Sequence, residues 1–164
     1  MRDRAIRVTN AATEHAAVRL DGTDKRIIRA LQEDGRMPYS KLGPLVGLSA
    51  PAVRQRVLQL IDQGVMQVVA VTDPLTLGFG IQAMLGVKVA GPLDVVADAV
   101  ADIEEVDYVV LTTGRFDMLL EIVCETNEHL LATVNQVRSL ERVSDVEVFG
   151  YIELVKQTYD WGTR

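Results

Sequence analysis

The sequence predicts an α+β protein of two domains, because the spacing of its apolar residues changes partway along the chain. Up to about residue 64 these residues recur every three or four positions, as on one face of a helix. From Ile81 onward they alternate, as in half-buried strands. Charge divides the chain as well: residues 1–70 carry 11 Lys/Arg and 7 Asp/Glu, and residues 71–164 carry 6 and 16. The resulting charges of +4 and −10 indicate a basic module joined to an acidic one.

The composition indicates a folded chain and excludes several classes of protein. With 164 residues, 48% of them hydrophobic and 24% charged, the chain can bury a core. Its single cysteine, Cys124, excludes an internal disulfide framework and a cysteine-built zinc site. No apolar run approaches the roughly 18 residues that span a bilayer. We therefore expect a cytoplasmic protein that has no membrane contact, no metal and no other cofactor.

Three short helices are predicted in the first half of the chain. Asp21, with Asp24 three residues later, fits a capping box at the start of the first helix. The second helix begins at about Ser40 and ends at Gly47, and Ser49 caps the third. A tight, glycine-containing turn between two short helices is typical of a helix-turn-helix unit.

The third helix carries side chains that suit nucleic acid on its outer face. Its inner face is apolar, and its outer face presents Pro51, Gln55 and Gln59, flanked by Arg54 and Arg56. Glutamine and arginine match adenine and guanine edges in the major groove, and arginine also matches phosphate. The alternative is a helical packing domain with an exposed polar face.

The second half predicts the element order β-α-β-β-α-β. A further strand, Val65–Thr72, is expected to leave the helical unit first. The six elements are a strand from Ile81 to Val89, a helix after Gly91-Pro92, strands Val106–Thr112 and Phe116–Val123, a helix capped by Thr126, and a strand Val143–Val155. This order is the ferredoxin-like split unit, with two helices on one face of a four-stranded antiparallel sheet.

Both faces of this sheet are predicted to be apolar. The helix capped by Thr126 carries the apolar residues Leu130, Leu131, Val134 and Val137, which we expect to face the sheet. The opposite sheet face should present Met84, Leu119, Val123, Phe149 and Tyr151. Because such a face is too apolar to stay in water, we expect an isologous homodimer packed sheet against sheet. A twofold dimer also supplies two helices for a pseudo-palindromic DNA site.

The motifs, in their order and spacing, resemble the Lrp/AsnC family of transcriptional regulators (leucine-responsive and asparagine-synthase regulators). The resemblance covers most of residues 20–156. It rests on Leu20-Asp21-Gly22-Thr23-Asp24, Asp34-Gly35-Arg36, Gly47-Leu48-Ser49, Arg56-Val57-Leu58-Gln59-Leu60, Asp73-Pro74, Leu77-Gly78-Phe79-Gly80 and Thr113-Gly114-Arg115-Phe116-Asp117.

The resemblance implies a winged helix-turn-helix domain joined to an effector (RAM) domain that dimerises, often assembles into octamers, and senses amino acids or related molecules. It implies base contacts by Ser49, Ala50, Pro51, Arg54 and Gln55. Arg56 falls where the family holds a phosphate or buttresses the fold, and we expect Lys41 to help fix the phosphate register. The effector positions would be Thr112, Thr113, Gly114, Arg115 and Asp117. The strand after Gly64 carries less charge than is usual in the family.

The Thr-Gly-Arg-Phe-Asp turn has chemistry that suits a zwitterion. Backbone N–H groups at Gly114 and the guanidinium of Arg115 suit a carboxylate, and Asp117 suits an ammonium group. The alternative is an ordinary hairpin in which Gly114 supplies a positive φ and Asp117 caps backbone groups.

The sequence thus predicts a DNA-binding transcriptional regulator of amino-acid or related metabolism that has no catalytic activity. Its expected divisions are a flexible arm (1–19), the helix-turn-helix domain (20–64), a strand and hinge (65–79), the effector domain (80–156) and a tail (157–164). Its partners would be double-stranded DNA, a small-molecule effector and further copies of itself. Two alternatives are an architectural DNA-bridging protein without an effector and a dimeric ferredoxin-like enzyme.

Overall fold

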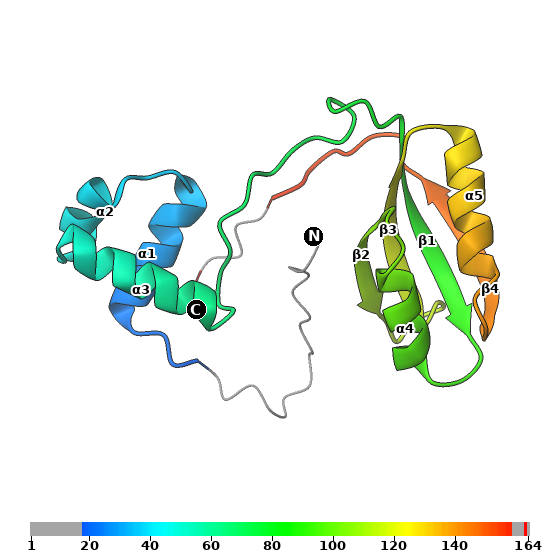
Figure 1. Ribbon diagram of the computed structural model, residues 1–164, viewed down its shortest axis with the longest axis horizontal. Helices are drawn as coiled ribbons and strands as arrows, with labels where there is room; N and C mark the ends of the chain where they lie inside the picture. The colour runs from blue at the N-terminus through cyan, green and yellow to red at the C-terminus, as the bar shows by residue number, and fades with distance from the viewer. Residues whose placement is uncertain (1–17, 159–162, 164) are drawn as a thin grey trace. The chain divides into compact units, whose positions relative to one another are not determined.

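The computed structural model describes residues 18–158 and 163, which belong to two compact units (Figure 1). One unit is made from the described part of residues 1–70 and 157–164, and the other from residues 71–156. Most of the arm expected at residues 1–19 lies outside the described residues.

Three helices form the first unit: α1 (Gly22–Glu33), α2 (Tyr39–Val46) and α3 (Ala50–Asp62). The capping box of Asp21 and Asp24 is present at the start of α1. Gly47 ends α2 with a φ of 74°, a backbone conformation that glycine adopts without strain, and Ser49 caps α3. The predicted helix-turn-helix is therefore confirmed. Its core is formed by Ile27, Ile28, Leu42, Val46, Val53, Val57 and Leu60.

The strand predicted at Val65–Thr72 is wrong. Residues 65–72 form no strand and pair with none of the four strands of the described sheet. A strand needs a neighbour to bond its N–H and C=O groups, and alternating apolar residues alone do not supply one. Val68, Val69 and Val71 are exposed as a result.

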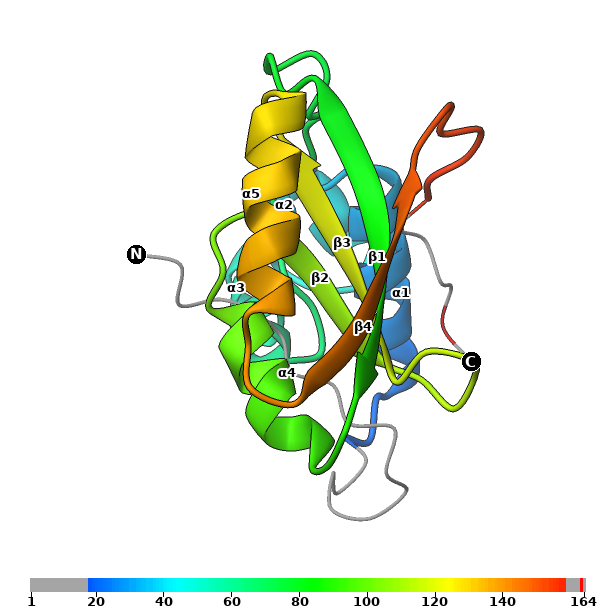
Figure 2. The same ribbon diagram turned by 90° about the vertical axis from the view of Figure 1, so that its right-hand side faces the viewer.

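The second unit is a four-stranded antiparallel sheet with two helices, as predicted. The strands are β1 (Ile81–Val89), β2 (Val106–Leu111), β3 (Met118–Cys124) and β4 (Val143–Gly150), in the spatial order β2-β3-β1-β4. The helices α4 (Leu93–Ala101) and α5 (Asn127–Arg138) cover the same face of the sheet (Figures 1 and 2). This arrangement confirms the ferredoxin-like unit and leaves the other sheet face open.

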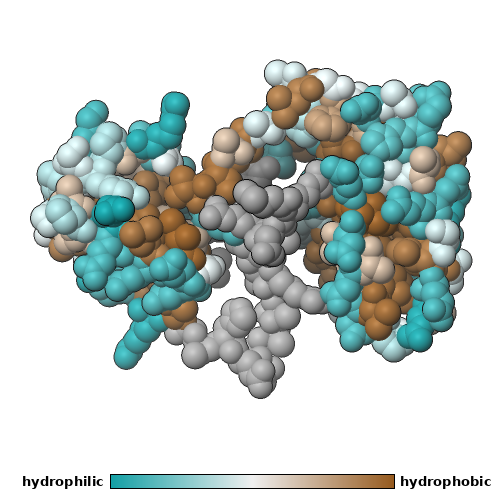
Figure 3. Space-filling model, viewed as in Figure 1, coloured by the Kyte–Doolittle hydropathy of each residue, from teal (hydrophilic) through white to brown (hydrophobic). Residues whose placement is uncertain are grey.

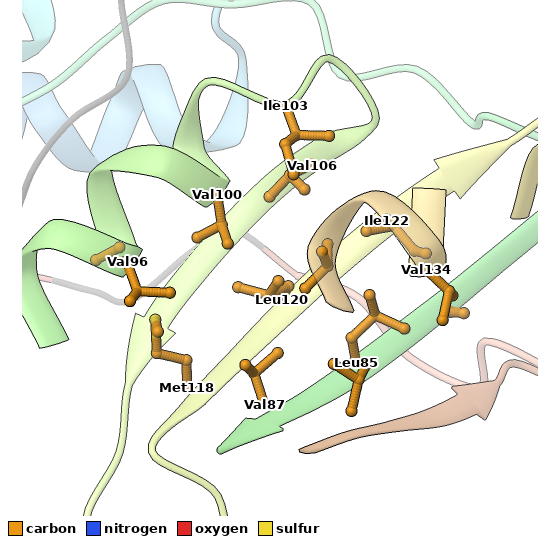
Figure 4. Close-up of a cluster of buried hydrophobic side chains, with 14 of the residues drawn as sticks. Leu85, Val87, Val96, Val100, Ile103, Val106, Met118, Leu120, Ile122 and Val134 are labelled. Carbon is orange, nitrogen blue, oxygen red and sulfur yellow. The ribbon is translucent and has the colours of Figure 1, made fainter. Parts of the chain in front are cut away.

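The core of this unit lies between the helices and the sheet. Val87 and Leu120 point from the central strands toward Val96 and Val100 of α4, and Leu85 lies near Val134 of α5 (Figure 4). These side chains are all buried. Burial of this kind stabilises a fold by about 25 cal/mol per Å² of apolar surface, so the layer between helices and sheet holds the second unit together.

Two details of the second unit differ from the prediction. Leu131 is 59% exposed, because the buried stripe of α5 is centred on Val134 and Val137 and includes Thr133 instead. The Thr133 hydroxyl is satisfied inside the helix by the carbonyl of His129 at 3.0 Å. The last strand ends at Gly150 rather than Val155, because its ladder with β1 ends at the pair of Ala83 and Gly150.

Candidate DNA and ligand sites

The outer face of α3 presents polar side chains at its N-terminal end. Pro51, Arg54 and Gln55 are exposed and Ala50 is half-buried, whereas Val53 and Val57 face the core. The Ser49 hydroxyl accepts a hydrogen bond from the Ala52 N–H at 3.4 Å, so it helps to start the helix.

Lys41 is exposed on α2, the helix before the turn. It comes from a different element than the α3 side chains, and α2 packs against α3. In a helix-turn-helix unit the first helix of the pair crosses the DNA backbone. A lysine there has the charge that a phosphate contact needs.

Arg56 is turned toward α1 rather than toward solvent. One of its terminal nitrogens lies 2.7 Å from Asp21 Oδ2 and 2.7 Å from Asp24 Oδ1. The other oxygens of both carboxylates complete the capping box, because Asp21 Oδ1 accepts from the Asp24 N–H and Asp24 Oδ2 accepts from the Asp21 N–H. Of the two roles expected for Arg56, this geometry favours buttressing the fold. Its contact with phosphate stays a prediction.

The same contacts change the acidity of the cap. The backbone N–H of Asp24 and the Arg56 guanidinium lower the pKa of Asp21 to about 2. They stabilise the charged carboxylate in the folded chain only, so the start of α1 and the middle of α3 are tied by charge.

The turn between β2 and β3 is tied to β1 by its last residue, Asp117, and closed on itself by its first, Thr112. Asp117 N–H donates to the Val87 carbonyl at 3.0 Å, and the Val89 N–H donates to Asp117 Oδ2 at 2.8 Å. Thr112 N–H donates to the Asp117 carbonyl at 2.9 Å, and its hydroxyl donates to the Phe116 carbonyl. Thr112 and Asp117 therefore shape the turn, while Thr113, Gly114 and Arg115 form its exposed tip.

The alternative to a ligand site was an ordinary hairpin, with a positive φ at Gly114 and a backbone group capped by Asp117. The structure agrees with the second feature but not with the first. Asp117 does cap a backbone N–H, as that alternative required. Gly114 does not have a positive φ, so that part of the prediction is wrong. A side-chain carbon at Gly114 would meet no described atom within 4 Å. The turn itself thus gives no reason for a glycine at its tip.

Phe116 holds the turn against the open face of the sheet. Its ring lies on the bare backbone of Gly86 in β1, where a Cβ would come within 2.7 Å of three ring carbons. The ring also packs edge-on against Phe149, with centroids 5.9 Å apart and planes at 75°. Sequence reasoning missed this contact. The signal was a glycine inside an otherwise alternating strand, which often marks a close approach.

Arg115 stacks over the Phe116 ring and pairs with a carboxylate on β4. Its guanidinium carbon is 5.2 Å from the centre of the Phe116 ring, and its terminal nitrogen is 3.0 Å from Glu147 Oε2 on β4. The turn is therefore part of the open sheet face, since strands β1 and β4 both contact it.

One part of the open face places apolar side chains beside the carboxylate of Glu121. Tyr108 is 52% exposed and Phe149 is 42% exposed, and the strand register places Glu121 beside Tyr108 and Met84. Burial, and next the charge of Glu121, raise the pKa of Tyr151 to about 12. The phenol thus stays protonated near neutral pH and can donate to the carboxylate.

The Asp21 contacts predict a specific acid sensitivity. Asp21→Asn keeps an N-cap oxygen, because asparagine caps helices as well as aspartate does, but removes the ion pair with Arg56. Because the pKa of Asp21 is lower in the folded chain than its ordinary value of 3.8, the charged carboxylate stabilises the fold above pH 3.8. This stabilisation is lost as the pH falls toward 2. We expect the thermal midpoint of the unaltered protein to fall more steeply between pH 4 and pH 2 than that of Asp21→Asn. Asp62→Asn, an exposed carboxylate change on α3, should keep the steep fall; equal slopes in Asp21→Asn and the unaltered protein would contradict the role of Asp21.

The packing of Phe116 predicts that Gly86 tolerates no side chain. Gly86→Ala would push the Phe116 ring away from the sheet, and overpacking of this kind costs about 1–3 kcal/mol. Gly114→Ala is the matched control and should change stability by about 0.5 kcal/mol or less. Denaturant unfolding measures both, and a Gly86→Ala protein as stable as the control would show that the ring does not rest on the backbone.

Comparisons with known proteins place these two units in one family. Residues 20–61 match the model of the AsnC-type helix-turn-helix domain, and residues 82–161 match the Lrp/AsnC ligand binding domain. The HTH-type transcriptional regulator FL11 of Pyrococcus furiosus is 33% identical over 141 residues, which are 85% of this chain and 93% of that protein.

Solved structures give the same result. A transcriptional regulator of Neisseria meningitidis in complex with L-Met has a TM-score of 0.75 at 27% identity, over 86% of this chain and 95% of that one. The leucine response regulatory protein of Mycobacterium tuberculosis has a TM-score of 0.77 at 25% identity, over 84% and 96%. The chain belongs to the Lrp/AsnC family of transcriptional regulators, with a helix-turn-helix domain that binds DNA and a ligand-binding domain.

Proposed function

We propose that this regulator binds DNA as a homodimer, or as a larger assembly of dimers, and responds to an amino acid bound at the turn of residues 112–117. The observation that carries the proposal is the pairing of two exposed sites in one chain. One is the polar N-terminal end of α3, and the other is the turn tip with Arg115 on the open sheet face. The protein acts as a binding protein in the cytoplasm and performs no catalysis.

DNA is read by the exposed start of α3. Residues at the N-terminal end of a recognition helix reach base edges in the major groove. Arg54 and Gln55 are exposed there, and their side chains are the ones that pair with guanine and adenine. Ser49, Ala50 and Pro51 form the leading turn of the same surface. Lys41 contacts phosphate from α2, and Arg56 holds α3 in place through α1.

A base-reading role for Gln55 predicts a loss of specificity on truncation. Gln55→Ala should reduce discrimination between the protein's own upstream DNA and scrambled DNA by about 1–3 kcal/mol, while binding to scrambled DNA changes little. Gln63→Ala, the same change at the C-terminal end of α3, should leave discrimination intact. Competition binding in fluorescence anisotropy measures the ratio. Equal losses on both DNAs would assign Gln55 to the backbone instead.

The amino acid is held by its carboxylate at the turn tip. Arg115 supplies a guanidinium, which binds carboxylates through two parallel hydrogen bonds, and Gly114 leaves room for a close approach to backbone N–H groups. The relative from Neisseria meningitidis was solved with L-Met, which makes L-methionine the first probe.

A second copy of the chain covers the open sheet face. Tyr108 and Phe149 expose large apolar surface there, and Figure 3 shows further apolar side chains at the surface of this unit. Isolated monomers seldom leave contiguous apolar patches of this kind in water. A twofold packing of two such faces also places the turns of both copies at one interface.

Ligand binding predicts a stabilisation that depends on the turn tip. In a thermal-shift screen of the twenty amino acids, at least one should raise the unfolding temperature of the protein, and Gly114→Val should abolish this response without changing the mass of the oligomer. Asp117→Asn keeps an oxygen for the Val89 N–H and should preserve the turn, unlike Asp117→Ala. If no amino acid changes either the unfolding temperature or the oligomer mass, the protein is a DNA-bridging protein without an effector.

A further inference from the structure

We infer that Glu147 is a built-in competitor for the carboxylate of the ligand at the turn of residues 112–117. Its carboxylate forms an ion pair with the guanidinium of Arg115 until the carboxylate of a ligand displaces it. This inference rests on the proposed function, because it concerns the same ligand site. It assigns a specificity role to a residue on β4, outside the turn.

The guanidinium of Arg115 is held in one orientation by two contacts. It lies over the Phe116 ring, 5.2 Å from the centroid, and its terminal nitrogen is 3.0 Å from Glu147 Oε2. The ring in turn rests on Gly86 and against Phe149, so it is a fixed platform. An arginine stacked on a fixed ring keeps its planar edge available for a carboxylate. In this structure the carboxylate on that edge belongs to Glu147.

Recognition of a negative group at the turn depends on Arg115. It is the only cationic residue between positions 112 and 117. The Thr112 hydroxyl donates to the Phe116 carbonyl, and Asp117 Oδ2 accepts from the Val89 N–H. Those two side chains therefore position the turn. A zwitterionic ligand has to bring its carboxylate to the group that Glu147 already binds.

The ion pair is weak enough to be exchanged. The Arg115 side chain is 71% exposed and that of Glu147 is 39% exposed, so water screens their attraction. Displacement of Glu147 leaves its charge on the open sheet face, beside Phe149 on the same strand. Since a second copy covers this face, ligand binding alters the charge at the contact between copies.

The test compares Glu147→Gln with Asp145→Asn. Both changes remove one negative charge from the same face of β4, but the register pairs Asp145 with Lys88, away from Arg115. By titration calorimetry, Glu147→Gln should bind L-methionine about two- to fivefold more tightly than the unaltered protein, which is the range expected for loss of an exposed ion pair. Asp145→Asn should not. L-methioninamide, which lacks the carboxylate, should gain nothing from Glu147→Gln.

A second comparison ties the effect to Arg115. Arg115→Ala should weaken L-methionine binding, and adding Glu147→Gln to it should give no gain. Equal L-methionine affinity in Glu147→Gln and Asp145→Asn would overturn the inference, as would a gain that persists without Arg115. Both results leave the proposed function standing, provided that the unaltered protein binds L-methionine. If it binds none of the twenty amino acids, the proposed function fails and this inference fails with it.

Discussion

The central strand β1 is the element on which the second unit depends, because each of its faces has a different task. Leu85 and Val87 face the helices and are fully buried in the core. Between them, the backbone of Gly86 contacts the Phe116 ring on the opposite face of the strand, because no side chain separates the two. The residue that seats the turn of residues 112–117, the proposed ligand site, thus lies between two residues of the core. Any side chain at Gly86 would separate the turn from the sheet without touching the core.

The two units divide the charge of the chain according to their partners. Residues 1–70, which contain α1, α2 and α3, carry a net charge of +4, and residues 71–164 carry −10. Phosphate attracts the first and repels the second, so this distribution of charge favours DNA contact by the helix-turn-helix unit and disfavours it for the ligand-binding unit. Within the basic part, Arg56 forms ion pairs with Asp21 and Asp24, the capping residues of α1. Lys41 and Arg54, the cations proposed to contact DNA, are exposed.

Periodicity and capping residues were enough to predict the helix-turn-helix, the order of the strands and the open sheet face. They failed where structure depends on a partner. Val65–Thr72 has the residues of a strand but no neighbour to pair with, and Leu131 lies at the edge of a buried stripe whose centre the pattern did not locate. The turn residues were found by family resemblance. The roles of Gly86 and Glu147 were not, because they arise from contacts between residues far apart in sequence.

In the proposed mechanism, one molecule couples a ligand at the turn to DNA at α3. The most direct test is fluorescence anisotropy of the protein's own upstream DNA, titrated with the full chain in the presence and absence of an amino acid that stabilises the protein. The amino acid should shift the binding curve, and Gly114→Val should bind the DNA equally well but show no shift. Identical curves with and without a stabilising amino acid would contradict this mechanism, because two sites are coupled only if a ligand at one changes affinity at the other.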